Sequence, residues 1–380
     1  MKLVPTQDQQ DLQTTLRRVL ARQCPTTLVR DLQDAGSDGF VPALWAALAD
    51  VGVFGLAFGE EYGGAGAGLY ELGLFFTEAG RVLCPSVVYS TLRFGVAVSR
   101  LGSAAQRQRY LPALAAGDLR ATIAAWNPGD AGDLRPTVRA RPTAGGWTLN
   151  GTLEFAANTG RADVVLLTAE ATVFAEPTRT YAYFVDPAAD GWHDEPLRTM
   201  SGDKQSRVVL QEVFVPTDSV IDGTQGGGVS AQDLRWVANT AVALQCMEMV
   251  GGTTAVLEQT VDYTKSREQF GRPIGSFQAA QHIVADIHIG LDGARLAAAQ
   301  AVWWLGRGEV ATRAVAIAKM QCSETYKWAT LNAHQLHGGM GYVRETDLHL
   351  WSERAKATEI AGGTADVAAR WLQKEIGLVS

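Results

Sequence analysis

Apolar and polar residues follow two different periods along this chain, and the change of period divides it into three blocks. Up to about residue 117, apolar residues recur every three or four positions, which predicts helices. A run of glycines at 63–68 interrupts this spacing before it resumes. The helices predicted in the first block cover residues 8–23, 40–51, 69–82 and 111–116.

The middle block, residues 118–222, consists of short segments rich in Val, Thr and aromatic residues. Gly, Pro and Asp turns separate these segments, as is typical of strands. The predicted strands cover residues 137–141, 147–149, 164–168, 181–185 and 208–215. The pattern indicates an antiparallel β unit.

Helical spacing returns after a glycine-rich joint at residues 223–228. The helices predicted there cover residues 234–266, 277–306, 309–336 and 364–376. Their apolar faces favour a bundle with oligomer contacts. The whole pattern predicts an α+β chain with domains at residues 1–117, 118–222 and 223–380.

Composition narrows the classes of function. A net charge of −7 and a pI near 5.5 argue against binding to nucleic acid or to an anionic membrane. The polar first ten residues contain no apolar segment of a signal peptide, and we expect no membrane span. The four cysteines form no CxxC pair, which favours free thiols in a reducing cytoplasm. His282 and His288 lack partners for a metal site, so none is predicted.

Several segments match a known family in order and spacing. The matching segments are Leu44-Trp45, 52–56, Glu60 to Gly64, Val213 to Pro216, Tyr263-xxx-Arg267-x-Gln269-Phe270-Gly271-x-Pro273-Ile274, Gln335 to Tyr342, and Gly363-Thr364. Together they resemble the acyl-CoA dehydrogenases over nearly the whole chain. The most specific match is the segment that contains Arg267.

This resemblance implies a fold and an activity. The expected fold is an N-terminal helical domain, a middle antiparallel β-barrel domain and a C-terminal four-helix bundle. The expected reaction is FAD-dependent α,β-dehydrogenation of an acyl-CoA thioester, with electrons passed to an electron-transfer flavoprotein.

The resemblance also assigns residues to one half of the FAD site. The residues implied to contact the adenosine–pyrophosphate half, across a subunit interface, are Arg267, Gln269, Phe270, Gln335, Gly338 and Gly339. A guanidinium is a fixed cation with a planar donor fork, and two glycines allow backbone N–H groups to approach phosphate closely. The alternative is that Arg267 only complements the end of its helix and the glycines form a plain turn.

The residues that would hold the flavin ring depart from the family pattern. In the first wall, Trp126 replaces a flavin-bonding Thr and Gly132 replaces a Ser. In the second wall, which follows Phe155, Ala157 replaces another flavin-bonding Thr. These changes indicate a filled or unusable ring pocket.

The catalytic base is missing from both positions that the family uses. One position is Gly362, and the other, 26 residues before Arg267, is Ala241, followed by Val242. Removal of an α-proton requires a carboxylate near the thioester. We therefore assign no catalytic residue.

Four other side chains were weighed for chemistry. Glu248 and Glu359 are weak substitutes for the base, since the first is about 10 Å too far along its helix and the second is expected in a salt bridge. Asp366 is expected to cap the last helix. His337 is expected to pack or to contact the dinucleotide.

Three hypotheses follow. The chain is the non-catalytic subunit of a heteromeric acyl-CoA dehydrogenase, as in the branches that act on steroid side-chain CoA thioesters, and a homologous catalytic chain completes the FAD site. Alternatively, it is a self-sufficient dehydrogenase with an unrecognised base, or a non-enzymatic descendant that serves as a binding or scaffold protein.

Overall fold

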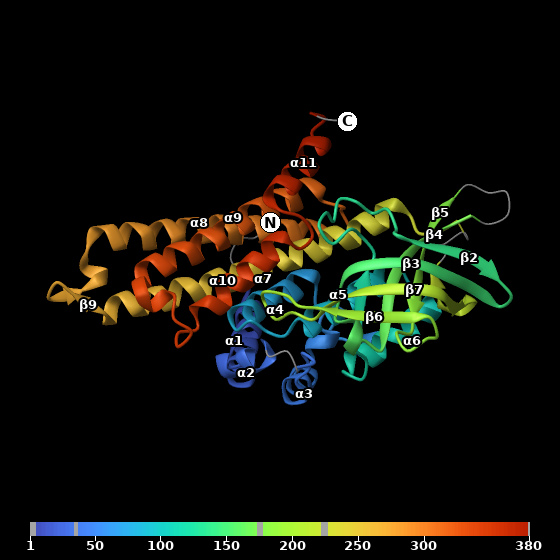
Figure 1. Ribbon diagram of the computed structural model, residues 1–380, viewed down its shortest axis with the longest axis horizontal. Coiled ribbons are helices and arrows are strands. Elements are labelled where there is room, and N and C mark those ends of the chain that lie inside the picture. The colour runs from blue at the N-terminus through green and yellow to red at the C-terminus, as the bar shows by residue number, and fades with distance from the viewer. Residues whose placement is uncertain (1–4, 34–36, 173–177, 222–226, 379–380) are drawn as a thin grey trace. The chain divides into compact units, whose positions relative to one another are not determined.

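Helices form both ends of the chain and strands form its middle (Figure 1). The structure is a computed structural model that describes residues 5–33, 37–172, 178–221 and 227–378. It confirms the predicted fold class: a helical N-terminal part, a central sheet and a C-terminal helical region. The joint predicted at residues 223–228 lies mostly outside the described residues.

Contacts between residues group the chain into two units, which we describe separately. The sheet unit comprises Arg30–Leu72 and Pro85–Ala241, and the bundle unit comprises Met1–Val29, Gly73–Cys84 and Val242–Ser380. These units are discontinuous in sequence. The domain boundaries at residues 117/118 and 222/223 therefore stay a prediction.

A mixed sheet forms the centre of the sheet unit. Among the described residues, its strands lie in the order β6-β7-β3-β2-β4-β5-β8, and β1 pairs with β4. The strands are β1 (Ala121–Ala124), β2 (Val138–Thr143), β3 (Gly146–Ala157), β4 (Val164–Ala171), β5 (Arg179–Val185), β6 (Trp192–Leu197), β7 (Gln205–Pro216) and β8 (Val220–Ile221). The expected antiparallel pairing holds for β2–β3, β3–β7, β4–β5, β5–β8 and β6–β7, but β4 runs parallel to β1 and β2. The chain reverses direction between β2 and β3 and again between β3 and β4. Strand β4 therefore runs in the same direction as β2.

Strand β4 contributes to hydrophobic clusters on both faces of the sheet. Val165 and Leu167 belong to one cluster, whereas Val164 and Leu166 belong to the other. This alternation arises because successive side chains of a strand point to opposite faces. Helices α5 (Ser86–Leu101) and α6 (Ala104–Ala115) pack on the second face. Other α-helical elements of the sheet unit are the end of α2 (Thr26–Gln33), α3 (Pro42–Asp50) and the start of α7 (Ala231–Ser266). Its short 3-10 helices are η1 (Val53–Gly55), η2 (Glu60–Tyr62), η3 (Thr159–Arg161) and η4 (Thr217–Ser219).

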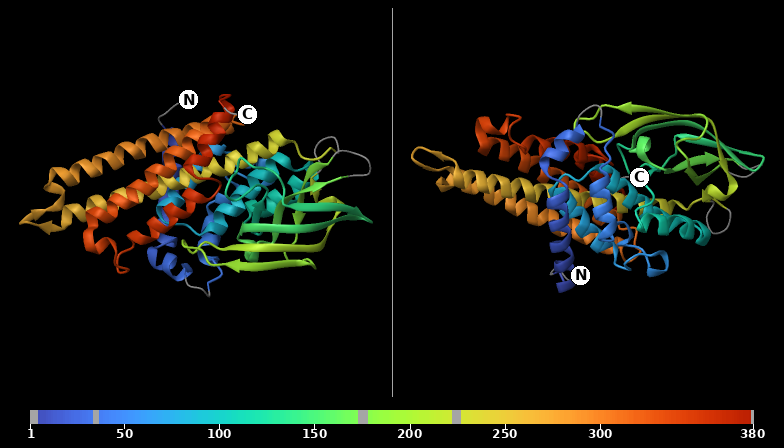
Figure 2. Two further views of the ribbon diagram at one scale, coloured as in Figure 1. Left: turned by 45° about the horizontal axis from the view of Figure 1, so that its top comes forward. Right: turned by 90° about the horizontal axis from the view of Figure 1, so that it is seen from below.

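Long helices make up the bundle unit. They are α1 (Gln7–Gln23), most of α4 (Leu69–Arg81), most of α7 (Ala231–Ser266), α8 (Gln278–Leu305), α9 (Thr312–His337), α10 (Leu348–Ile360) and α11 (Ala365–Glu375). Figure 2 shows α8 and α9 lying alongside the later part of α7. Gly80 of α4 and Gly251 of α7 allow these two helices to cross closely, since a Cβ atom on either would collide with the backbone of the other.

Helix α7 is long and apolar enough, by length and composition alone, to cross a membrane. However, 89% of its most apolar window is buried within the structure. Such burial is typical of a core helix in a globular protein.

Replacing Leu167 with Ala should destabilise the protein by about 2–5 kcal/mol, because the change removes buried methyl groups and leaves a cavity. Leu167 is completely buried in β4. Urea unfolding followed by circular dichroism measures the effect. Leu331→Ala is the matched control, since Leu331 is 61% exposed on α9, and should change stability by about 0.5 kcal/mol or less. Equal unfolding midpoints for the two variants would contradict this account of the core.

Candidate functional site

The end of α7 carries three of the predicted site residues on an exposed hairpin. Strands β9 (Glu268–Gln269) and β10 (Arg272–Pro273) pair around Phe270 and Gly271, whose φ angles are +55° and +74°. Two consecutive positive φ angles are typical of a type I′ turn. The hairpin starts at Arg267, whose carbonyl accepts a hydrogen bond from the N–H of Ile274 at 2.9 Å.

The side chains of this hairpin face solvent. Arg267 and Gln269 are exposed, and Phe270 is 94% exposed. An apolar ring in that position gains nothing from folding, because it buries almost no surface. The exposure of Phe270 therefore favours a role in binding.

The end of α9 carries the other three predicted residues. Gln335 is exposed in the last turn of the helix, and Gly338 and Gly339 begin the short 3-10 helix η6 (Gly338–Gly341). A Cβ atom built on either glycine would meet no other atom within 4 Å. The backbone of this turn is thus accessible to a ligand, as a phosphate-binding turn requires.

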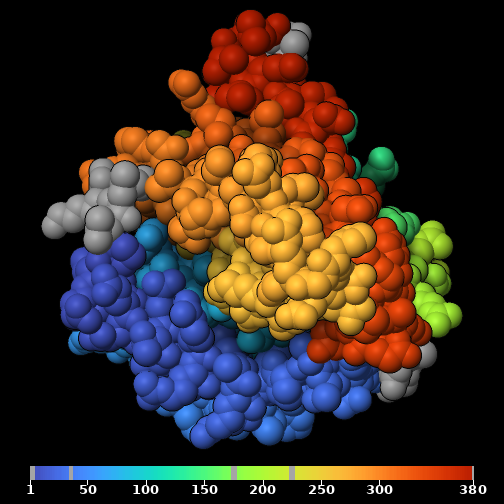
Figure 3. Space-filling view, turned by 90° about the vertical axis from the view of Figure 1, so that its left-hand side faces the viewer, coloured from blue at the N-terminus to red at the C-terminus, as the bar shows by residue number. Residues whose placement is uncertain are grey.

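A contact between Tyr263 and His337 brings these two segments together. Their rings stack with centroids 4.2 Å apart and planes 19° from parallel, and the Tyr263 hydroxyl donates to the carbonyl of His337 at 3.3 Å. Tyr263 lies one helical turn before Arg267, and His337 directly precedes Gly338. On the face of the bundle unit shown in Figure 3, the gold segment near residue 270 lies beside the orange-red segment near residue 340.

The environment of His337 favours packing over acid–base chemistry. Burial lowers its pKa, although its Nδ1 also donates a hydrogen bond to the carbonyl of Ala333 at 2.8 Å. A carbonyl can only accept, so the proton lies on Nδ1. His337 is therefore a neutral ring that joins α7 to α9, and the packing role expected of it agrees with this geometry.

These segments fit the adenosine–pyrophosphate half of FAD. Arg267 offers a cation, Gln335 an amide, and the turn at Gly338 and Gly339 a backbone that no side chain covers. All three lie at one end of the bundle unit. Such a set suits a doubly charged pyrophosphate with a polar neighbour.

The first wall at the family's ring position, which contains Trp126, is formed by packed and hydrogen-bonded residues. Trp126 follows β1 and packs against the hydrophobic cluster that contains Phe94 and Leu166. The loop after it is closed by its own hydrogen bonds, and Arg235 of α7 donates to the carbonyls of Ala131 and Gly132 at 3.1 and 2.5 Å. The indole is thus a packed side chain in place of a hydroxyl donor.

An ion pair fixes the far end of this loop. Arg135 donates two hydrogen bonds to Asp133, each 2.8 Å long, and they lower the pKa of that carboxyl to about 2. Asp133 is therefore a carboxylate at neutral pH, and its charge is already balanced by Arg135.

The second wall ends in a well-anchored backbone without a hydroxyl. β3 is irregular between Leu153 and Ala156, and Phe155 in this bulge has a φ of +51°. Asn158, which follows Ala157, is buried and bonded: Ser86 donates to its Oδ1 at 3.1 Å and its Nδ2 donates to Ser90 at 3.2 Å. Residues 126 and 157 lack the side-chain hydroxyls that threonines would offer to a flavin ring.

Gly362 lies at a turn position that requires glycine. Ala361 has φ −62° and ψ 127°, Gly362 has φ +73°, and the N–H of Gly363 donates to the carbonyl of Ile360 at 3.0 Å. This is a type II turn, in which the third residue has a positive φ. Local backbone geometry thus accounts for a glycine where the family carries a base.

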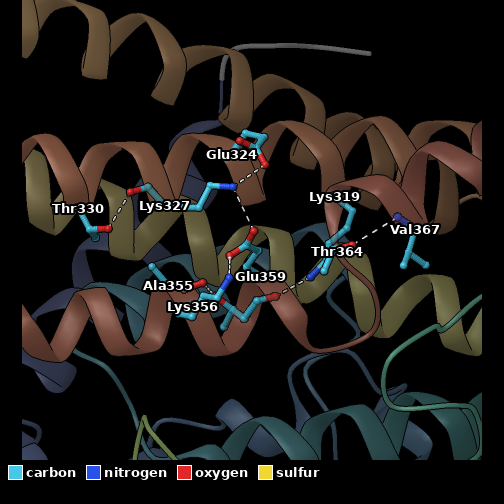
Figure 4. Close-up of polar contacts among 10 residues, drawn as sticks. Lys319, Glu324, Lys327, Thr330, Ala355, Lys356, Glu359, Thr364 and Val367 are labelled. Atoms are coloured by element: carbon cyan, nitrogen blue, oxygen red, sulfur yellow. Dashed lines mark hydrogen bonds and ion pairs between the residues drawn. The ribbon is translucent and has the colours of Figure 1, made fainter.

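A buried lysine of α9 donates to the C-terminal end of α10, next to this turn (Figure 4). Lys319 of α9 is completely buried, and its ammonium donates to the carbonyls of Thr358 and Ala361 at 2.6 and 2.9 Å and to the side chain of Gln245 at 3.1 Å. Carbonyls at a helix C-terminus attract cations. Lys319 therefore caps α10 and fixes the position of the turn.

Both acids considered as a substitute base are engaged in ion pairs. Glu248 is buried and pairs with Arg354 at 3.4 Å. Glu359 accepts hydrogen bonds from Lys327 at 3.1 Å and Lys356 at 2.8 Å (Figure 4). Burial alone would raise the pKa of Glu359, but the hydrogen bonds from the two lysines outweigh it and the pKa is lowered. A carboxylate held in this way is a poor base.

Three further positions complete the comparison with the sequence. Ala241 and Val242 are both buried on α7 and supply no carboxylate. The expectation for Asp366 was wrong: Thr364 is the N-cap of α11 and accepts from the N–H of Val367 at 3.5 Å. Thr364 occupies the position that precedes the first turn, whereas Asp366 lies within that turn.

Sequence reasoning did not single out Lys319, His334 or Arg235. Lys319 could have been noticed as a lone charge in the apolar and small run 314–320. His334 and Arg235 carried no such signal, since their partners are distant in sequence.

Comparisons with known proteins agree with this arrangement. Residues 6–118 match the family model of the acyl-CoA dehydrogenase N-terminal domain, and residues 236–377 match that of the C-terminal domain. Acyl-CoA dehydrogenase FadE12 of Mycobacterium tuberculosis is 30% identical over 352 residues, which cover 88% of each chain. This chain belongs to the acyl-CoA dehydrogenase family.

Two solved structures are similar to this acyl-CoA dehydrogenase family member over almost its whole length. The steroid acyl-CoA dehydrogenase Tcur3481–Tcur3483, a G363A variant, is 28% identical with a TM-score of 0.86 and covers 98% of each chain. The ChsE4–ChsE5 complex from Mycobacterium tuberculosis is 26% identical with a TM-score of 0.88 and covers 100% of each chain.

Glu359→Gln should destabilise the protein at pH 7 by roughly 1 kcal/mol, because charge-assisted hydrogen bonds to two partly exposed lysines are lost. Since the folded pKa is lowered, this stabilisation is complete above the ordinary pKa of about 4.3 and is lost as the pH falls through the folded pKa. Urea unfolding at pH 7 and near pH 3 should show the difference from wild type shrinking at the lower pH. Glu345→Gln, an exposed control before α10, should have little effect at either pH. A difference that grows on acidification would contradict the assigned ion pairs.

Proposed function

We propose that this chain is the non-catalytic subunit of a heteromeric, FAD-dependent acyl-CoA dehydrogenase. It contributes Arg267, Gln269, Phe270, Gln335, Gly338 and Gly339 to the adenosine–pyrophosphate half of an FAD. The flavin ring and the catalytic base belong to a homologous partner chain. The complex carries out α,β-dehydrogenation of an acyl-CoA thioester.

The observation that carries this proposal is a contrast between two half-sites in one chain. The segments at Arg267 and Gly338 are exposed, joined and open to a ligand. The ring walls lack hydroxyls at residues 126 and 157, and the turn at Gly362 lacks a base. If one FAD spans two chains, this chain needs to supply only the segments at Arg267 and Gly338.

These residues give this chain and its partner different roles in the reaction. Arg267 neutralises pyrophosphate charge, and the two glycines at 338 and 339 allow the backbone to approach the phosphate closely. Gln335 supplies a polar contact at the same edge. Bound FAD supplies the hydride acceptor, while the partner's carboxylate takes the α-proton of the thioester. This chain thus binds and orients the cofactor and performs no proton transfer.

Three large apolar residues on an exposed face of α9, Ile317, Trp328 and Leu331, favour a partner chain. The residues exposed along one side of this helix are Arg313, Ile317, Gln321, Glu324, Trp328, Leu331 and Gln335. Their spacing of three and four places them on one helix face. Trp328 and Leu331 lie within two turns of Gln335, so a chain that covers them also reaches the dinucleotide segments.

Exposed apolar residues are also present on α8. Gly293 of α8 faces Gln321 of α9, with a Cβ position 3.4 Å from the amide nitrogen of Gln321. Ile289 and Leu296, on either side of Gly293, are 68% and 48% exposed. Exposed large apolar side chains gathered on neighbouring helices are a feature of protein–protein contact surfaces. The homologous catalytic chain is the partner we propose for it.

The substrate class and the electron acceptor are proposed by similarity, and the compartment is proposed from the cysteines. The likeness to a steroid acyl-CoA dehydrogenase supports a steroid side-chain CoA thioester as the substrate. An electron-transfer flavoprotein is proposed as the acceptor. Four buried free cysteines are consistent with a reducing cytoplasm.

Purification from source cells tests this function directly. The tagged chain should retain a homologous acyl-CoA dehydrogenase chain in a 1:1 ratio, together with bound flavin. The chain produced alone should be colourless. A yellow, active single chain would overturn the proposal.

Arg267→Ala should weaken the binding of FAD in the complex by roughly ten- to a hundredfold. This factor corresponds to the loss of a hydrogen bond to a charged group, which contributes about 1.5–3 kcal/mol. The fold should be unchanged, since the Arg267 side chain is exposed. Flavin fluorescence after dilution measures retention. Arg139→Ala, an exposed arginine on β2, is the control. Equal flavin occupancy in the two variants would exclude the role assigned to Arg267.

Trp328→Asp should separate this chain from its partner, with a Kd at least about tenfold higher, because buried tryptophans often dominate interfaces. Size-exclusion chromatography of the coexpressed chains measures the complex. Met200→Asp is the control, since Met200 is also exposed but belongs to the sheet unit. A complex unaffected by Trp328→Asp would show that the partner binds elsewhere.

A further inference from the structure

His334 occupies the junction between α9, the glycine turn and α10. Its Nδ1 lies 2.7 Å from the carbonyl oxygen of Gly341, and its Nε2 lies 2.6 Å from the hydroxyl of Ser352 on α10. Since the carbonyl can only accept, Nδ1 carries a proton and donates. The hydroxyl of Ser352 can then donate to Nε2. One side chain therefore holds both the end of η6 and a neighbouring helix.

The turn is folded tightly over this residue. Gly341 is buried, and a Cβ atom there would lie 2.9 Å from the carbonyl oxygen of His334 and 3.2 Å from its Nδ1. The far side of the turn is held by Thr346, whose hydroxyl donates to the carbonyls of Met340 at 2.8 Å and Val343 at 3.1 Å. The shape of residues 338–346 is thus set by His334, which precedes the turn, and by Thr346 at its end.

Tyr342 is held against the same ring. It stacks on His334 with centroids 5.3 Å apart and planes 28° from parallel, yet it remains 80% exposed. A tyrosine so exposed stabilises the fold little by burial. Its orientation, like that of the turn, depends on His334.

We propose that His334 is a positioning residue for the dinucleotide site. It holds the Gly338–Gly341 turn in the conformation whose accessible backbone receives the pyrophosphate, without touching the cofactor itself. This inference rests on the proposed function. His337 links the turn to the Arg267 hairpin, and His334 sets the shape of the turn, so the two histidines have distinct roles.

Preorganisation is the physical basis of this role. A turn that is ordered before binding spares the complex the entropy of ordering it afterwards. Without His334, residues 338–342 would lose a hydrogen bond and a stacking surface but no contact to the ligand. The expected consequence is weaker binding with the rest of the fold intact.

The test uses the complex of this chain with its catalytic partner, freed of flavin, and adenosine diphosphate, which contains the adenosine and pyrophosphate of FAD. His334→Leu should weaken binding of adenosine diphosphate, measured by calorimetry, by about tenfold, or about 1.4 kcal/mol. His334→Asn, whose amide can still donate to the carbonyl of Gly341, should recover most of the affinity. His288→Leu, an exposed histidine on α8, should change nothing.

Hydrogen exchange gives a readout that needs no ligand. In the unliganded chain, residues 338–346 should exchange faster in His334→Leu, and His334→Asn should restore most of their protection. Faster exchange across the whole bundle unit, or an Asn variant no better than Leu, would reduce His334 to a general stabilising residue and overturn the inference.

The outcomes also separate this inference from the proposed function. If wild type binds adenosine diphosphate and His334→Leu binds it equally well, only the role of His334 fails. If wild type does not bind it at all, the dinucleotide site itself fails, and the proposed function fails with it.

Discussion

The stack between Tyr263 and His337 is the contact on which the candidate site depends. It joins the last turns of α7 and α9, two helices whose motifs are 68 residues apart from Arg267 to Gln335. Burial keeps His337 neutral, so the contact places no charge beside the cation of Arg267. An open glycine turn and an exposed guanidinium can therefore face the same ligand.

The residues at the family's ring and base positions differ from the family pattern, and local contacts account for each of them. The turn at Gly362 requires a positive φ, and Lys319 fixes it from inside the bundle. Trp126 belongs to a hydrophobic cluster, and Arg235 clamps the loop that follows it. The residues at these positions are therefore held by hydrogen bonds and by packing. The absent hydroxyls and carboxylate have been replaced by stable alternatives, which is the behaviour expected of a chain that carries a structural share of a joint site.

Sequence pattern was sufficient for the elements whose apolar residues repeat clearly. It located α7, α8 and α9 and the strands β4, β5 and β7, because each buries a continuous apolar face. It missed α10, where Arg354 and Glu359 are buried through ion pairs with distant residues and no apolar stripe results. It also missed β6, a mostly exposed strand at the end of the sheet order, whose side chains are largely polar. The motifs predicted which residues gather at the site, but the partners of His334 and Lys319 depend on folding and could not be read from spacing.

Dye reduction by the purified single chain tests the central claim most directly, with and without Gly362→Glu. Acyl-CoA thioesters, including a steroid side-chain thioester, serve as substrates, and thermal unfolding checks that the variant tolerates a side chain at positive φ, which costs about 1–2 kcal/mol. The account predicts no activity and no bound flavin in either protein, because a restored base would still lack a ring pocket. Activity in the unmodified chain, or activity that appears only with Gly362→Glu, would contradict it and show that the flavin site of this chain is complete.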